Sequence, residues 1–286
     1  MSIYRINHFK TLEEIPESLF LFLNQNPLSN YETLQSLEEL KKNPGKYGNL
    51  LECLTVERND TILVATFRVP SYNVLISHAH DLNAVTAIVE YMGQKNIIIP
   101  GIFGLSEVSN LFVKEWETLY SDRFQTSNDS WFLLLEHLYK LPKNIGKIHI
   151  ASRVHEDMLL RWSEASILEL IPNSPKSFLE SCKKNVSRRI QDNKVFILLV
   201  NDKVVSMGSI TGRYRDLQFI NDVYTPPEYR CKGYATKLCI ELVQTIRRNN
   251  KRPVLTVFVT NEKAIRIYTK IGFKQKFKVA LYLKQN

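Results

Sequence analysis

Hydrophobic residues recur at two different spacings along the chain, and these spacings predict an α/β protein. Residues 51–79 hold three runs rich in Leu, Val, Ile and Thr, separated by turn residues, as expected of strands. Residues 81–93 have helical spacing instead. A short apolar strand is expected at residues 96–99, then a Pro/Gly loop, then a helix on which one face carries Val108, Leu111, Phe112 and Trp116.

The first 48 residues are expected to be helical. The pattern places a capped start near Thr11 and a break within residues 41–49, where Pro and Gly interrupt a polar segment.

Beyond residue 150 the pattern predicts two helices and then a mostly antiparallel sheet with helices packed on it. Asn201 and Asp202 form a turn pair between two apolar runs, which is typical of a hairpin. Pro226 and Pro227 end the third strand, because proline supplies no backbone N–H for pairing. The expected elements are helices at 153–170 and 175–190, strands at 195–200, 203–213 and 217–225, a helix from 234 with an apolar face to 246, a strand at 252–259, a helix at 260–272 and a strand at 276–283.

A chain of 286 residues fits two domains, and the clearest break in composition lies around Pro142 and Gly146. We therefore expect domains at residues 1–146 and 147–286. No run of apolar residues approaches the roughly 18 needed to span a membrane. The four cysteines are scattered, without spacing typical of a metal site or a disulfide framework. A cytoplasmic protein with free thiols is the expectation.

The charge is divided unevenly between the two halves. Residues 1–150 hold 13 Lys and Arg against 17 Asp and Glu, a net charge of −4, whereas residues 151–286 hold 25 against 12, a net charge of +13. This basic surplus suggests an anionic partner for the second half, either a phosphorylated small molecule or a nucleic acid. A solvated basic surface without a partner is the alternative.

The segment Arg230-x-x-Gly233-x-Ala235 lies where a predicted strand ends and a predicted helix begins. The first turn of a helix has unpaired N–H groups and the positive end of the helix dipole, so it binds phosphate oxygens well. Gly233 and Ala235 let the backbone approach an anion, and Arg230 and Lys232 add positive charge. The segment is interpreted as a cradle for a diphosphate.

These residues resemble the GNAT superfamily of acyl-CoA-dependent N-acetyltransferases. Its signature, Arg/Gln-x-x-Gly-x-Gly/Ala after the central strand, is matched by Arg230, Gly233 and Ala235, although Cys231 stands where a small residue is more usual. A second match is a helix opened by asparagine, with residues Asn261, Ala264, Tyr268, Gly272 and Phe273. The resemblance covers about residues 148–286. It implies tandem GNAT-like domains, each with a mixed, mostly antiparallel central sheet flanked by helices and splayed at the acyl-CoA site, the first domain being degenerate.

The resemblance also implies which residues bind acetyl-CoA as co-substrate. Backbone amides of the Arg230 to Ala235 segment would hold the diphosphate, the pantetheine arm would pair with residues 223–225, and the Val223 amide would polarise the thioester carbonyl. The implied binding residues are Val223, Tyr224, Thr225, Arg230, Cys231, Lys232, Gly233, Tyr234, Ala235 and Asn261.

Tyr268 occupies the position of the family's general acid, where a phenol can protonate the leaving thiolate. It shares a helix face with apolar residues, so a core role is also open. Candidate bases for the attacking amine are Asp222, Glu169 and Glu180, and none is assigned.

In the first half, His78, His80 and Asp81 lie close together, but no further ligand cluster accompanies them, and a strand-end or surface role is expected rather than a metal site. The expected activity is transfer of an acetyl group to a primary amine of a small molecule or peptide, with no metal, membrane or nucleic-acid partner. The alternatives are a non-catalytic CoA-binding sensor and an aminoacyl-tRNA-dependent transferase. The acceptor and the oligomeric state are not encoded in any recognisable pattern.

Overall fold

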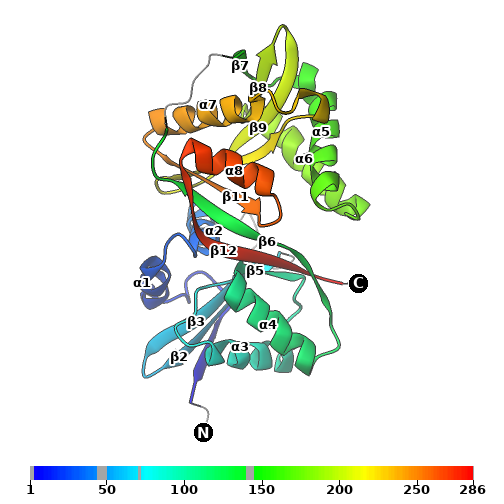
Figure 1. Cartoon of the computed structure of the whole chain (residues 1–286). Coiled ribbons are helices and arrows are strands. Elements are labelled where there is room, and N and C mark those ends of the chain that lie inside the picture. Colours follow the sequence, from blue (N-terminus) through cyan, green and yellow to red (C-terminus); the bar gives the residue numbers. More distant parts are fainter. Residues whose placement is uncertain (1–2, 44–49, 70–71, 140–144, 286) are drawn as a thin grey trace. The chain divides into compact units, whose positions relative to one another are not determined.

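The computed structural model describes residues 3–43, 50–69, 72–139 and 145–285, and it divides the chain into two compact units (Figure 1). Unit 1 comprises Met1–Trp131 and Phe277–Asn286, and unit 2 comprises Phe132–Lys276. The expected breaks at residues 41–49 and around Pro142 fall largely outside the described residues. The expected domain boundary at residue 146 stays a prediction.

Unit 1 is a mixed sheet flanked by helices. Its strand order is β1-β2-β3-β4-β5-β12, antiparallel except for the parallel pair β4 and β5. The elements are β1 (Arg5–Phe9), α1 (Glu17–Gln25), α2 (Tyr31–Lys42), β2 (Glu52–Arg58), β3 (Thr61–Arg68), β4 (Val74–Ile76), α3 (Asn83–Gln94), β5 (Gly101–Leu105), α4 (Ser106–Leu119), β6 (Phe124–Leu135) and the end of β12 (Phe273–Lys284).

The prediction that the first 48 residues are helical is confirmed for α1 and α2 but wrong for residues 5–9, which form strand β1, and the first helix begins at Glu17 rather than near Thr11. Strand β1 pairs antiparallel with β2. Polar side chains link the two strands: Arg5 forms an ion pair with Glu57 at 2.6 Å, and the Asn7 amide donates to the same carboxylate at 2.8 Å. A strand held by cross-strand polar contacts lacks the alternation of apolar residues that sequence reading detects.

The strand expected at residues 96–99 lies further along the chain. The observed strand is β5 (Gly101–Leu105), in the segment expected to form a Pro/Gly loop. A Cβ on Gly101 would lie 2.4 Å from the Tyr282 carbonyl oxygen, and one on Gly104 would lie 2.5 Å from the Ile76 carbonyl oxygen. The two glycines therefore allow neighbouring strands to approach closely. In the sequence alone, glycines with this role look the same as glycines of a loop.

Unit 2 repeats this architecture. Its strand order is β6-β11-β10-β9-β8-β7, antiparallel where β7, β8, β9 and β10 pair and parallel between β10 and β11. The elements are β7 (Lys147–Ile150), a 3₁₀ turn (Arg153–His155), α5 (Glu156–Leu170), α6 (Lys176–Gln191), β8 (Val195–Val200), β9 (Lys203–Tyr214), β10 (Leu217–Tyr224), a 3₁₀ turn (Pro227–Tyr229), α7 (Tyr234–Arg248), β11 (Arg252–Phe258) and α8 (Glu262–Ile271).

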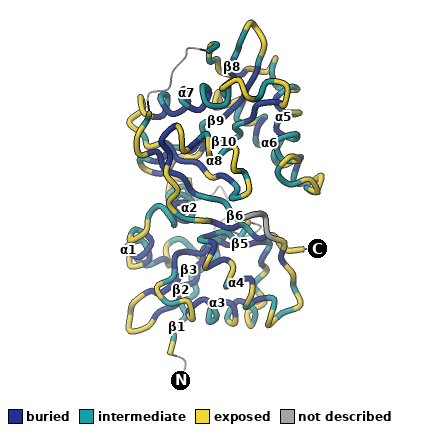
Figure 2. The backbone as a smooth tube through the Cα atoms, viewed as in Figure 1, coloured by how far each residue is buried: buried dark blue, intermediate teal, exposed yellow. Residues whose placement is uncertain are grey.

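The chain runs twice through one order of elements, strand, two helices, three strands, helix, strand, helix, strand, first from β1 to β6 and then from β7 to β12. The predicted tandem arrangement of mixed, mostly antiparallel sheets is confirmed. The predicted apolar face of α7 is confirmed too, because Leu238, Cys239, Leu242, Val243 and Ile246 are buried, as Figure 2 shows for one side of this helix. The sequence pattern did not predict strand β7, whose four residues directly follow the break in composition around Pro142 and Gly146.

Candidate functional site

The sheet of unit 2 opens between its two parallel strands. Strands β10 and β11 pair only from Leu217 to Phe219, opposite Arg252 to Val254. Both strands continue, to Tyr224 and Phe258, without further pairing between them among the described residues. This splay, which the sequence predicted after the central strand, leaves backbone groups of β10 available to an extended ligand.

A bulge in β10 accompanies the opening. Asn221 pairs with Ser209 and Tyr224 with Met207 of β9, so the backbones of Asp222 and Val223 have no pairing partner in that strand. Asp222 has a left-handed backbone, with φ of 54°. The bulge therefore frees the Val223 peptide from the ladder on the β9 side.

Side chains of β9 contact the carbonyl groups on either side of the bulge. The Ser206 hydroxyl donates to the Tyr224 carbonyl at 2.9 Å, and the Ser209 hydroxyl, which donates to Asp222 at 2.5 Å, lies 3.2 Å from the Asn221 carbonyl. These bonds hold the bulged strand in one conformation, which presents Val223 at a fixed position.

The loop after β10 leads into an uncapped helix start. Cys231 and Gly233 have left-handed backbones, with φ of 63° and 80°, and Gly233 is the residue before the first turn of α7. No described side chain caps this terminus, and the first turn contains no acidic residue. A Cβ placed on Gly233 would have no atom within 4 Å, so the space above it is open. The N–H groups of the first turn thus face a space that an anion can occupy.

Arg230 anchors this loop rather than standing free. Its Nε donates to the Thr225 carbonyl at 2.8 Å, and its guanidinium binds both carboxylate oxygens of Glu169 on α5 at 2.8 and 2.6 Å. The Tyr224 hydroxyl donates to the same carboxylate at 2.8 Å, and burial together with Glu169 raises the pKa of Tyr224 to about 12. The structure therefore brings Tyr224, Thr225 and Arg230 together around Glu169, a distant partner that no local motif reveals.

Of the other cradle residues, Cys231 and Lys232 are exposed, while Tyr234 and Ala235 are partly buried in the first turn of α7. The Lys232 ammonium donates to the Glu228 carbonyl at 3.3 Å. Cys231 is the exposed one of the four free thiols.

Asn261 caps α8, as predicted. Its side-chain oxygen accepts from the Ala264 N–H at 3.2 Å. The side-chain amide donors of Asn261 bind no described residue, so they stay available to a ligand.

Tyr268 is 8% exposed, on the buried face of α8, and its ring makes an edge contact with Phe273 at 5.9 Å. No described residue hydrogen-bonds its hydroxyl. Burial, and to a smaller degree Cys239 on α7, raises the pKa of Tyr268 far above its usual range. The phenol is therefore protonated at neutral pH. Both predicted roles, core packing and proton donor, are compatible with this position.

Each of the three candidate bases has a cationic partner. Asp222 forms an ion pair with Arg189 and accepts from the Ser209 hydroxyl at 2.5 Å. Glu169 is held by Arg230, and Glu180 lies 3.3 Å from Lys183. Because all three are engaged by a cation, none of them is assigned as the base.

The corresponding helix start of unit 1 is built differently. The Asp81 carboxylate accepts from the Asn83 N–H at 3.0 Å at the start of α3. A carboxylate in this position occupies the helix terminus with negative charge, which disfavours a phosphate there.

His78 of the same segment is 7% exposed, stacked on Phe22 at 4.4 Å, with Nδ1 2.9 Å from the Asn30 amide. It lies at the end of a strand, as expected, but buried rather than on the surface. Among the described residues there is no group of three or more His, Cys, Asp or Glu side chains that could hold a metal ion. Within the same residues, every helix is too short or too polar to cross a membrane.

Comparisons with known proteins agree with this geometry. Residues 159–273 match the model of the Acetyltransferase (GNAT) family. No curated protein matches the chain.

Three solved structures share the fold over nearly the whole chain. A GNAT family acetyltransferase from Colwellia psychrerythraea has 11% identity and a TM-score of 0.59, covering 98% of this chain and 100% of its own. A GCN5-related N-acetyltransferase from Sphaerobacter thermophilus has 13% identity and a TM-score of 0.61, covering 100% and 96%. A Drosophila protein has 14% identity and a TM-score of 0.64, covering 98% of each. Residues 159–273 thus match the acetyltransferase (GNAT) family model, and the three solved structures show that the chain has the GNAT fold in both units.

Proposed function

We propose that this protein is an N-acetyltransferase that moves an acetyl group from acetyl-CoA to a primary amine. The observation that carries the proposal is the uncapped start of α7, whose open N–H groups follow directly on the strand where the sheet splays. A diphosphate joined to an extended arm and a thioester is the ligand that these two features suit together.

The diphosphate would be held by main-chain N–H groups of residues 231–236. Gly233 leaves open space above the helix start, and the first turn carries no competing carboxylate. Arg230 contributes mainly by fixing the loop through Thr225 and Glu169, because its guanidinium is already engaged there. Lys232, which is exposed, adds positive charge nearby.

The pantetheine arm would lie along residues 223–225, in the gap between β10 and β11. The bulge frees the Val223 peptide from β9, so its N–H can polarise the thioester carbonyl. Asn261 would contact the arm through its side-chain amide donors, since its oxygen is engaged in capping α8.

In the reaction the amine nitrogen attacks the thioester carbonyl carbon, a C–N bond forms, and the C–S bond breaks. Tyr268 would give its proton to the departing thiolate. Burial raises the pKa of this phenol, so it is protonated at neutral pH. The amine loses one proton to a base that stays unassigned, since Asp222, Glu169 and Glu180 are each paired with a cation.

The test is release of free thiol from acetyl-CoA across a library of primary amines, with wild type and Tyr268→Phe. A positioned acid contributes about 100-fold or more, so Tyr268→Phe should lose that much turnover while its affinity for CoA is retained. Tyr214→Phe, at another buried tyrosine of unit 2, is the matched control and should keep both.

The outcomes separate the three functions. CoA binding without thiol release for any amine would indicate a sensor. Absence of CoA binding together with salt-dependent RNA binding would indicate the aminoacyl-tRNA-dependent alternative.

A further inference from the structure

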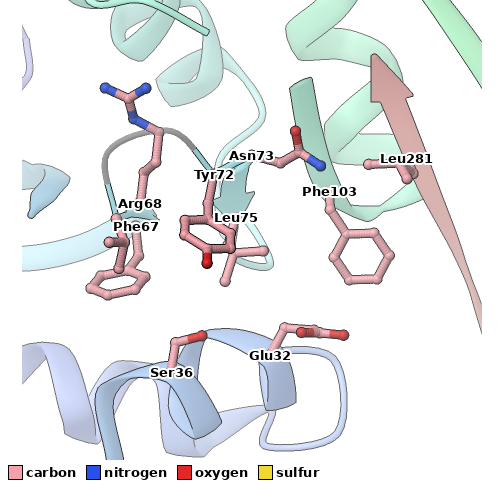
Figure 3. A pocket seen from close by; sticks show the side chains of 10 residues that line it. Glu32, Ser36, Phe67, Arg68, Tyr72, Asn73, Leu75, Phe103 and Leu281 are labelled. Atoms are coloured by element: carbon pink, nitrogen blue, oxygen red, sulfur yellow. The ribbon is translucent and has the colours of Figure 1, made fainter. Parts of the chain in front are cut away.

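Unit 1 contains a cavity of about 420 Å³ between α2 and one face of its sheet (Figure 3). The described residues that line it all belong to unit 1. Cavities that bind small organic molecules have about this volume.

The sheet side of the cavity is a continuous apolar row. Phe67 of β3 pairs with Leu75 of β4, Leu75 pairs with Phe103 of β5, and Phe103 pairs with Leu281 of β12. Residues directly opposite one another on neighbouring strands project to the same face, so the four side chains form one surface. Leu75, Phe103 and Leu281 are only partly buried, although they lie in the middle of a sheet.

Helix α2 contributes the polar side. Glu32 and Ser36, one turn apart, lie opposite the apolar row in Figure 3. Arg68 also borders the cavity, but Figure 3 shows its guanidinium directed away from Glu32. Glu52, its cross-strand neighbour, is the carboxylate that acts on Arg68 electrostatically.

No described Lys or Arg forms an ion pair with the Glu32 carboxylate. It accepts one hydrogen bond, from the Tyr31 hydroxyl to Oε1 at 2.7 Å, and no described residue donates to Oε2. Burial raises the pKa of Glu32, with the Tyr31 hydroxyl acting in the opposite direction. A partly buried carboxylate without a positive partner is unfavourable, and a bound cation relieves this.

We propose that this cavity binds a primary amine with an apolar body, the ammonium on Glu32 and the body against the row Phe67, Leu75, Phe103 and Leu281. Ser36 and Asn73, which also line the cavity, can accept the remaining ammonium protons. An anion is disfavoured beside the Glu32 carboxylate, because the guanidinium of Arg68, the other charged residue of the lining, is directed away from it in Figure 3. This site is separate from the proposed acetyltransferase site and does not depend on that assignment.

The experiment is isothermal titration calorimetry of the full chain with three probes of one shape, 4-phenylbutylamine, 4-phenylbutanol and 4-phenylbutyrate. The amine is expected to bind at least about tenfold more tightly than the alcohol, and the carboxylate more weakly still. Glu32→Gln keeps the oxygen that accepts from Tyr31 and removes the charge, so it should weaken amine binding about tenfold or more. Glu38→Gln, on the same helix outside the cavity lining, should leave it unchanged.

A cavity-filling variant tests the location separately. Phe103→Trp adds volume at the middle of the apolar row and should abolish binding of the amine, with folding monitored by circular dichroism. Equal binding of amine and carboxylate, unchanged binding by Glu32→Gln, or no binding of the amine to folded wild type would overturn the proposal. Affinity for CoA should stay at the wild-type value in Glu32→Gln. Loss of amine binding to the cavity and loss of CoA binding are therefore separate measurements, and either proposal can fail without the other.

Discussion

Gly233→Ala is the sharpest perturbation of the cradle, because the structure separates its effect on stability from its effect on binding. An alanine methyl would meet no atom within 4 Å, so no steric clash arises within the protein. The backbone φ of 80° is left-handed, and a non-glycine residue there costs about 1–2 kcal/mol. The methyl group would also occupy the open space above the helix start.

The expected loss of binding follows from the hydrogen bonds displaced. A charge-assisted hydrogen bond contributes about 1.5–3 kcal/mol, so losing one such bond to the diphosphate weakens CoA binding about 10- to 100-fold. Pantetheine, which lacks the diphosphate, should bind Gly233→Ala and wild type with equal affinity. Binding of both ligands is measured by calorimetry, and stability by urea unfolding.

Gly212→Ala is the matched control. Gly212 also has a positive φ, of 42°, and its Cβ would make only ordinary contact with Phe219 at 3.4 Å. This variant should lose a similar stability and keep its affinity for CoA. A folded Gly233→Ala that binds CoA within about twofold of wild type, or that loses pantetheine to the same degree, would refute the assignment.

Three further predictions concern single residues. Asn261→Asp should keep the cap of α8 and lose affinity for CoA, whereas Asn261→Ala should in addition lose about 1 kcal/mol of stability in urea unfolding. Equal affinity of wild type and Asn261→Asp for CoA would exclude a contact between Asn261 and the ligand. Cys231 should react with N-ethylmaleimide first among the four thiols and be protected by CoA, as followed by mass spectrometry; modification at an unchanged rate would mean that CoA binds elsewhere. Burial, and secondarily His80, lowers the pKa of His78 from 6.5 to about 4, so unfolding free energy should fall as pH drops from 6.5 towards 4, by at most about 1.4 kcal/mol per pH unit. The slope should be smaller in His78→Gln, and an identical slope would argue that this histidine is protonated in the folded state.

Local sequence signals predicted the elements that build the site. The apolar face of α7 and the asparagine cap of α8 each depend on residues within a few positions of one another. Such features follow from helix periodicity and from the capping preference of asparagine.

What sequence reading missed depends on distant partners. The motif predicts that Arg230 adds positive charge to the cradle, and it does not reveal that Glu169, 61 positions earlier, engages the guanidinium. Strand β1 is held by polar contacts with β2 about 50 positions later. The apolar row of unit 1 needs Leu281, from the far end of the chain, beside Phe103. Pairings over such distances leave no local pattern of spacing.

The central claim is that main-chain N–H groups at the start of α7 bind the diphosphate of CoA. A crystal structure of the complex with CoA tests it most directly. The account predicts diphosphate oxygens at about 3 Å from N–H groups of residues 231–236, with the arm beside residues 223–225. A loop filled by its own side chains, with CoA bound elsewhere on the protein, would contradict it.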